Sequence, residues 1–357
     1  MCIRDSIRSE ASLYGTYAFV TELNPTGTDL VYSTYLSGTE ATGSPETYGF
    51  GIAADATDNA YIVGTTNSLT YPTTNGAYQT SASCTFPYQG TCTTAFVTKV
   101  SPGGSKLSYS TYLGTGANRA NAVAIDSSGD AFVVGNTEAN TFPTTPGAFM
   151  TSSKSDESLA FVTELNPSGT ALVYSTFLAG TTSNTTYLDD AYAVAVDASG
   201  CAYVTGTASD SDFPTTPGAY EKNLLDYSDA FVTKFNFAGS ALEYSTYLPG
   251  LTTGYGIGVN SSGEAYVAGD NYGNGNDFPT TPDALRTSPP TTSTNGFLTV
   301  FNSTGSGLVY STYLGPTTPS GNNALTVAWA VEMCIRDRIS FNATRRRTGS
   351  VCSASHT

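Results

Sequence analysis

The chain has 357 residues, a formal net charge of −15 and only 12% charged residues, whereas 24 Tyr and 17 Phe supply ample material for a buried core. This composition excludes a disordered chain, and the scarcity of Lys and Arg argues against nucleic acid as a partner, since phosphate binding needs clustered cations. No run of about 18 apolar residues predicts membrane insertion, and the low charge with abundant Thr, Ser and Gly favours strands and turns in an extracellular protein.

The first six residues return almost unchanged at positions 333–338, although the sequences around the two copies differ. One DNA sequence, with a variable third base in its last codon to give either Ser or Arg, can encode both copies, and it resembles a transposase mosaic end. We therefore expect residues 1–6 to be an adapter-derived artefact and residues 333–357 to be an artefact followed by a chimeric tail. The remaining segment, 7–332, is expected to be a fragment of a longer protein.

In chain order, the first predicted element is a hairpin that contains Ala-Phe-Val-Thr at 18–21 and Val-Tyr-Ser-Thr-Tyr-Leu at 31–36, with a Gly-containing turn between them. The hairpin returns four times, and its successive Phe residues lie 77, 65, 70 and 66 positions apart. These residues are Phe19, Phe96, Phe161, Phe231 and Phe297.

Two further strands precede each complete hairpin, for example at 122–126 and 131–135. Each period thus predicts a four-stranded antiparallel meander, and such a unit, repeated without helical pattern, is typical of one β-propeller blade. A β-solenoid is the alternative, but its coils are usually shorter than this period. The turn between the first two strands carries an Asp or Asn that we interpret as a turn cap rather than a ligand. These residues are Asp55, Asp126, Asp197 and Asn260.

The predicted fold is all-β: a β-propeller with about four complete blades, two partial ones and an incomplete ring. The expected boundaries are 7–48 for a partial blade of outer strands, 49–114, 115–179, 180–249 and 250–315 for complete blades, and 316–332 for the start of another, which begins with a strand at 328–331.

The first strand of each predicted blade has Ala or Gly on one face, as at Gly51 and Ala53. Small residues on one face are expected where inner strands crowd around a propeller axis. The opposite face carries larger apolar residues that we expect to pack against the next blade. These are Ile52, Val123, Val194 and Ile257.

The repeated motifs resemble the bacterial SBBP repeat family, or seven-bladed β-propeller repeats. They are the Ala-Phe-Val-Thr and Tyr-Ser-Thr-Tyr-Leu elements and Phe-Pro-Thr-Thr-Pro-Gly-Ala, which stands at 142–148 and 213–219. The resemblance covers nearly all of 7–332. It implies a bacterial cell-surface or secreted protein, often with neighbouring domains, and carries over no catalytic residue, because these are scaffold motifs.

A function should use the propeller face that bears the second-to-third loops and the interblade connections, because these are long here, whereas the other turns are tight. Three loop tyrosines, Tyr48, Tyr88 and Tyr187, are candidates for contacting a ligand. Cys84 and Cys92 close a short loop and are a candidate disulfide, consistent with an oxidising compartment. Cys201 is expected to be a free thiol.

The sole His is His356, in the excluded tail, so the fragment offers no His for a catalytic triad or a zinc site. We therefore expect a non-enzymatic surface scaffold or binding module whose partner is a glycan or a surface protein, with no cofactor. Two alternatives stay open. One is a lyase- or glycosidase-type propeller enzyme that uses loop carboxylates, chiefly Asp189 and Asp190, and the other is a calcium-dependent adhesion module.

Overall fold

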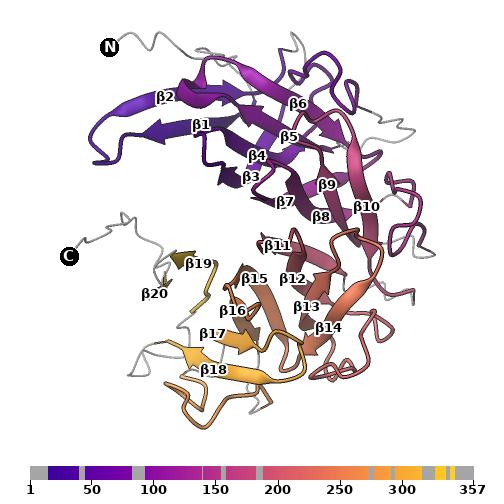
Figure 1. The fold of residues 1–357 in the computed structure, drawn as a ribbon, viewed down its shortest axis with the longest axis vertical. Helices are drawn as coiled ribbons and strands as arrows, with labels where there is room; N and C mark the ends of the chain where they lie inside the picture. The colour runs from indigo at the N-terminus through magenta and orange to yellow at the C-terminus, as the bar shows by residue number, and fades with distance from the viewer. Residues whose placement is uncertain are drawn as a thin grey trace.

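A computed structural model describes residues 15–39, 45–82, 93–138, 140–153, 158–181, 188–272, 277–290, 294–315, 326–334 and 338–341. In these ranges the chain forms antiparallel sheets that follow one another along an arc (Figure 1), and one short 3-10 helix, Pro102–Gly104. Four sheets have four strands each, paired in sequence order from first to fourth. The predicted all-β propeller fold with four-stranded blades is therefore confirmed.

We number the complete sheets as blades 1 to 4. Blade 1 is β3 (Thr47–Ala54), β4 (Ala60–Thr66), β5 (Thr94–Val100) and β6 (Leu107–Leu113), and blade 2 is β7 (Asn118–Ile125), β8 (Ala131–Thr137), β9 (Leu159–Leu165) and β10 (Leu172–Leu178). Blade 3 is β11 (Asp190–Val196), β12 (Ala202–Ala208), β13 (Asp229–Phe235) and β14 (Leu242–Leu248), and blade 4 is β15 (Thr252–Val259), β16 (Ala265–Tyr272), β17 (Thr294–Phe301) and β18 (Leu308–Leu314).

Two shorter sheets flank the four blades. A hairpin of β1 (Ala18–Leu23) and β2 (Leu30–Leu36) packs on blade 1, and β19 (Val331–Cys334) pairs with β20 (Arg338–Phe341) near the other end (Figure 1). The prediction of a strand at 328–331 is wrong for all of these residues except Val331, because residues 326–330 have no strand pairing. This segment nevertheless lies against blade 4: the Ala328 amide donates to the Gly269 carbonyl of β16 at 3.3 Å, and a Cβ at Gly256 of β15 would meet the backbone of Ala330.

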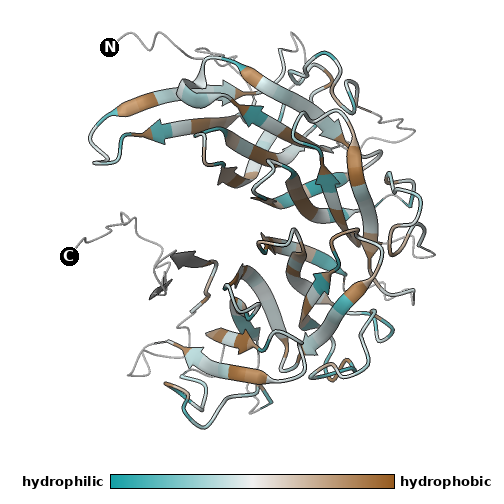
Figure 2. Ribbon diagram, in the orientation of Figure 1, coloured by the Kyte–Doolittle hydropathy of each residue, from teal (hydrophilic) through white to brown (hydrophobic). Residues whose placement is uncertain are grey.

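The core lies between neighbouring blades, where apolar side chains of one sheet meet those of the next. Figure 2 shows that hydrophobic residues recur along the strands of successive blades. The expectation that the larger first-strand residues pack against the next blade is wrong. Val123 clusters with Tyr61 and Val63 of the preceding blade, whereas the small residues face the following one. A side chain at Gly51, for example, would meet the backbone of Ala122. Small residues thus allow adjacent first strands to approach closely.

The Phe-Pro-Thr-Thr-Pro segments run beside the outermost strands and cover their edges. In blade 2 the Thr145 amide donates to the Ser175 carbonyl at 3.0 Å, and the Phe177 amide donates to the Met150 carbonyl at 3.0 Å. The Phe149 amide then donates to Gly239 in the next blade at 2.9 Å. Because these segments protect an edge and join two blades, they are parts of the scaffold rather than free loops.

The recurring Asp and Asn residues cap the turns between first and second strands, as predicted. The Asp126 Oδ1 atom accepts hydrogen bonds from the amides of Ser128 at 2.9 Å and Asp130 at 2.8 Å. Asp197 and Asn260 accept equivalent bonds from residues two and four positions later. These side chains satisfy turn amides that the ladder leaves unpaired.

Candidate functional site

A β-bulge interrupts the first strand of every complete blade. The pairing of β3 with β4 shifts between Gly49 and Gly51, so Phe50 has no partner, and the same shift occurs in β7, β11 and β15. A bulge turns the inserted residue out of the regular alternation, and bulges are common beside functional sites. The inserted residues are Phe50, Asn121, Tyr192 and Tyr255.

A glycine on the second strand makes room for each bulge. A Cβ atom at Gly64 would overlap the carbonyl oxygen of Tyr48, and a Cβ at Gly206 would overlap that of Asp190. Gly135 and Gly269 stand in the same relation to their first strands. The glycine at the fifth position of each second strand is therefore required by a close backbone approach.

The bulge residues form a row along the first strands of successive blades, which we call the inner-strand row. The ring centroids of Tyr192 and Tyr255 are 5.6 Å apart, and those of Tyr255 and Trp329 are 4.6 Å apart. Trp329 continues the row in the segment beside blade 4 and is 54% exposed. At the other end, Phe50 is 40% exposed and stacks on Tyr48 with the ring centroids 6.2 Å apart.

Polar groups lie among these rings. The Arg119 guanidinium carbon is 3.8 Å from the centroid of the Phe50 ring, and the Asn121 side-chain amide donates to the Ala191 carbonyl at 2.8 Å. Asp190 accepts from the Ser158 hydroxyl at 3.0 Å and from the Tyr192 hydroxyl at 3.1 Å. Burial raises the pKa of Asp190, and it raises the pKa of Asp270, near Tyr255, to about 6.

Two of the residues predicted from sequence lie at this row, because Tyr48 stacks on Phe50 and Asp190 bonds to Tyr192. Their predicted position in loops is wrong: the pairing of each first strand begins early enough to include Tyr48 in β3 and Asp190 in β11. Asp189 does not join them. It is buried, and its carboxylate accepts from the backbone amides of Gly180 at 2.8 Å and Ser209 at 2.8 Å. The remaining predicted site residues, Tyr88, Tyr187, Cys84 and Cys92, lie outside the described residues.

The sequence interpretation missed Phe50, Tyr192, Tyr255 and Trp329. A strict alternation of faces, counted back from the turn Asp, assigns them to ordinary strand positions, and the bulge breaks that alternation. A signal was nevertheless present: the residue five places before each turn Asp or Asn is aromatic in blades 1, 3 and 4.

Other features of the described part of the chain bear on the predictions. Cys201 is a free, buried thiol, as expected. Among the described residues, no group of three or more His, Cys, Asp or Glu side chains is arranged to hold a metal ion. No helix in the described ranges is both long and apolar enough to cross a membrane.

The profile of the SBBP β-propeller repeat matches residues 31–69 and 108–143. Each match begins in the outermost strand of one sheet and ends after the second strand of the next, so the sequence repeat is offset from the blade. No curated protein sequence matches the chain.

Solved structures with some likeness include a protein of unknown function from Bacteroides caccae, at 10% identity and a TM-score of 0.32 over 84% of this chain and 92% of that one. BamB from Moraxella catarrhalis has 13% identity and a TM-score of 0.35, with 87% and 73% covered. A mutant of the Synechocystis apocarotenoid oxygenase has 9% identity and a TM-score of 0.37, with 87% and 57% covered. Likenesses this low carry no conclusion about function.

Proposed function

Because this chain carries SBBP β-propeller repeats, we propose that it is a non-enzymatic binding module of a bacterial cell-surface or secreted protein, and that the inner-strand row holds its ligand, a glycan. The row lies in the first half of each first strand, next to the interblade connections. The ligand therefore approaches from the long-loop face of the propeller.

The observation that carries this proposal is the partly exposed aromatic row with polar groups between its rings. Sugar rings present apolar C–H faces that pack on aromatic side chains, while their hydroxyls need donors and acceptors nearby. Trp329, Tyr255 and Phe50 supply the aromatic surface. Arg119 and Asp190 supply the donor and the acceptor.

Two features of the chain support a binding role over an enzymatic one. The carboxylates of Asp189 and Asp190, the best acid pair in the sequence, have separate partners and do not converge on one point. The motifs that recur in every blade serve packing, turn capping and edge protection. We therefore assign the inner-strand row, within the described ranges, to binding a ligand and not to catalysis.

The proposal is tested with the full chain on an array of bacterial and host glycans, followed by calorimetry with the best ligand. We expect saturable binding that weakens about tenfold in Trp329→Ala and in Tyr255→Ala, because each loses a stacking surface. Phe237→Ala is the matched control, since this exposed aromatic residue lies on a tight turn at the opposite face. Equal binding by all four proteins, or no glycan binding, would reject the proposed site.

A further inference from the structure

Blades 1 and 3 each contain an ammonium group held between a turn aspartate and an aromatic ring. The Lys99 Nζ atom is 3.3 Å from an Asp55 carboxylate oxygen and 4.6 Å from the centroid of the Tyr61 ring. In blade 3, Lys234 Nζ is 3.5 Å from Asp197 and 5.1 Å from the Tyr203 ring centroid, and it also pairs with Glu243 at 2.7 Å. An aromatic face and a carboxylate together form a favourable environment for an ammonium ion.

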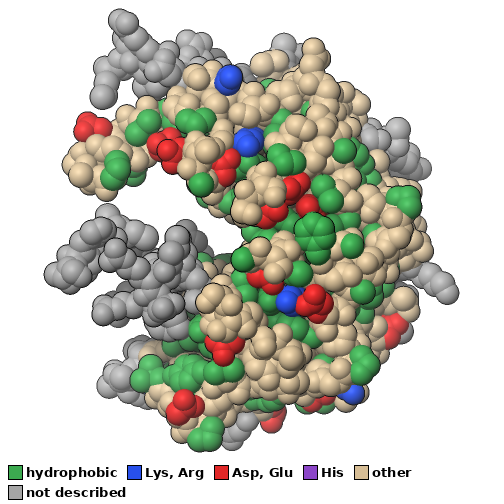
Figure 3. Space-filling view, viewed as in Figure 1, with side chains coloured by type: hydrophobic (Ala, Val, Ile, Leu, Met, Phe, Trp, Pro, Cys, Tyr) green, Lys and Arg blue, Asp and Glu red, His purple; other side chains and the backbone are tan. Residues whose placement is uncertain are grey.

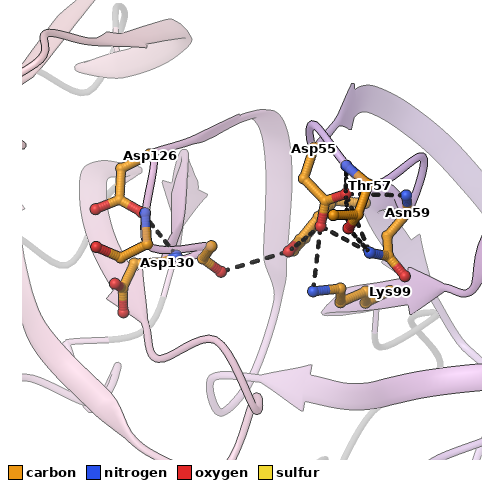
Figure 4. Close-up of polar contacts among 9 residues, drawn as sticks. Asp55, Thr57, Asn59, Lys99, Asp126 and Asp130 are labelled. Atoms are coloured by element: carbon orange, nitrogen blue, oxygen red, sulfur yellow. Dashed lines mark hydrogen bonds and ion pairs between the residues drawn. The ribbon is translucent and has the colours of Figure 1, made fainter.

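Blade 2 keeps the aspartate and the ring but lacks the lysine. The strand pairing that places Tyr61 opposite Lys99 places Phe132 opposite Glu164. Asp126 takes the position of Asp55, with Asp130 beside it (Figure 4). The position that holds a cation in blades 1 and 3 is therefore surrounded by acidic groups in blade 2.

Glu164 is buried without compensation. Its side chain is 3% exposed, and its Oε2 atom has no hydrogen-bond partner. Burial, followed by the charges of Asp130 and Asp126, raises the pKa of this carboxyl to about 8. A buried carboxylate without a partner is costly, so its position calls for a proton or a cation.

The same junction, between blades 2 and 3, is hollow. At the junctions after blades 1 and 3, the hydroxyls of Tyr61 and Tyr203 lie 3.6 Å and 3.5 Å from a Cβ built on the turn glycine of the next blade. Phe132 has no hydroxyl to fill this place. A groove of about 350 Å³ opens here between the turns at 125–128 and 196–200, and Asp126, Asp197 and Phe237 are among its lining residues.

Phe237 is a second departure from the repeat at this junction. The turn between the third and fourth strands has Pro25, Pro102 and Pro167 in the three preceding copies, but blade 3 has Phe237, which is 62% exposed. It lines the groove together with the hydroxyl-bearing Ser127 and Ser199. The groove is thus lined by one exposed aromatic residue, Phe237, and by two carboxylates, Asp126 and Asp197. On the face of the molecule drawn in Figure 3, Asp and Glu side chains gather toward the inner side of the arc, with few Lys or Arg side chains among them.

We propose that the groove between blades 2 and 3 binds a primary ammonium group, which takes the place that lysine occupies in blades 1 and 3. Asp126, which lines the groove, pairs with the ammonium, and Phe237 packs on the attached alkyl chain. Glu164 does not line the groove; it lies on β9 near Asp126 and adds its negative charge from behind the lining. The chain itself indicates the chemistry of the ligand, because the ammonium groups of Lys99 and Lys234 each contact a turn aspartate and an aromatic ring at the equivalent position of blades 1 and 3. This site lies at the tight-turn face and is independent of the proposed glycan site.

The test uses the full chain with two probes, n-butylammonium and Nα-acetyl-lysine amide, in calorimetric titrations. Wild type should bind saturably, and Glu164→Lys should bind about tenfold more weakly or not at all, because the new lysine restores the repeat and fills the site. Phe132→Tyr restores the missing hydroxyl without changing the charge and should also weaken binding. Asp283→Asn, which removes an exposed carboxylate far along the chain, should bind as wild type does.

The two probes distinguish the source of the ligand. Equal binding of both supports a free alkylamine, and tighter binding of the lysine amide supports a lysine side chain of another protein. Circular dichroism verifies that each variant is folded. If Glu164→Lys does not fold, the binding affinity of Phe132→Tyr decides the test. The proposal is overturned if neither probe binds wild type, if all folded variants bind alike, or if calcium binds to this junction in preference to both probes.

Discussion

Single residues distinguish blades that otherwise share one pattern. Lys99 and Lys234 compensate the turn aspartates of blades 1 and 3, while hydrogen bonds from Thr57 and Asn59, opposed by burial, hold the pKa of Asp55 below its ordinary value. Glu164 occupies the same strand position in blade 2 and adds a negative charge instead. One substitution therefore converts a satisfied ion pair into a group that must find a proton or a cation.

The burial of Glu164 predicts that stability depends on pH. Its pKa in the folded chain, about 8, lies above its ordinary value of 4.5, so between these values the folded state holds more protons than the unfolded state. Stability should therefore fall as pH rises from about 4.5 through 8, by at most about 1.4 kcal/mol per pH unit. The groups that face Glu164 are Asp126, Asp130 and Tyr174, with Cys201 nearby on blade 3.

Thermal unfolding of wild type and Glu164→Gln across this pH range measures the effect. The two melting temperatures should diverge as pH rises, with the Gln variant becoming the more stable, because its amide cannot ionise. Parallel curves would mean that Glu164 stays ionised and paired in the folded chain.

At the scale of elements, the bulge in the first strand depends on the glycine opposite it. Gly206→Ala places a Cβ against the Asp190 carbonyl oxygen, so the strand must shift or lose its bulge. We expect a loss of about 1–3 kcal/mol in the free energy of unfolding, together with weaker glycan binding because Tyr192 and Asp190 move. Denaturant unfolding and calorimetry measure the two effects.

Gly49→Ala is the matched control for this prediction. A Cβ at Gly49 would meet only ordinary contacts, the shortest being 3.7 Å to Ala18. Its free energy of unfolding should therefore stay close to that of wild type. A large loss in this control would show that the backbone of any first strand is intolerant of a side chain, irrespective of the bulge.

The whole molecule is an arc whose first sheet, β1–β2, packs on blade 1 with one face and has no neighbouring sheet on the other face among the described residues. Phe19 is 68% exposed, whereas the equivalent Phe96, Phe161 and Phe231 are completely buried. Ile52 is 63% exposed, although the equivalent Val123 is 8% exposed. An apolar sheet face of this kind promotes association.

We therefore expect the purified chain to self-associate through this face. Size-exclusion chromatography with light scattering should give a mass that rises with protein concentration, and the double variant Phe19→Ser, Ile52→Ser should reduce that rise. A monomer at all concentrations, with amides of β1 and β2 fully protected from hydrogen exchange, would contradict this expectation.

The sequence by itself determined the four-stranded blades, their order and the turn caps. These features depend on local alternation, on Gly-containing turns and on side chains that bond to their own turn amides, and such interactions act within a few residues. Because the pattern recurs in every blade, a local signal that is weak in one copy becomes a reliable prediction of the fold, as for the hairpin at Phe96 and its copies at Phe161 and Phe231.

Only the tertiary structure decided which side chains meet between blades. The inner-strand row depends on bulges that alternation does not predict, and the groove depends on Asp126 of blade 2 meeting Asp197 and Phe237 from two turns of the next blade. Asp189 and Asp190 are adjacent in sequence, yet one bonds to backbone amides and the other to Tyr192. Contacts between distant segments set these environments, because burial and charge act through space.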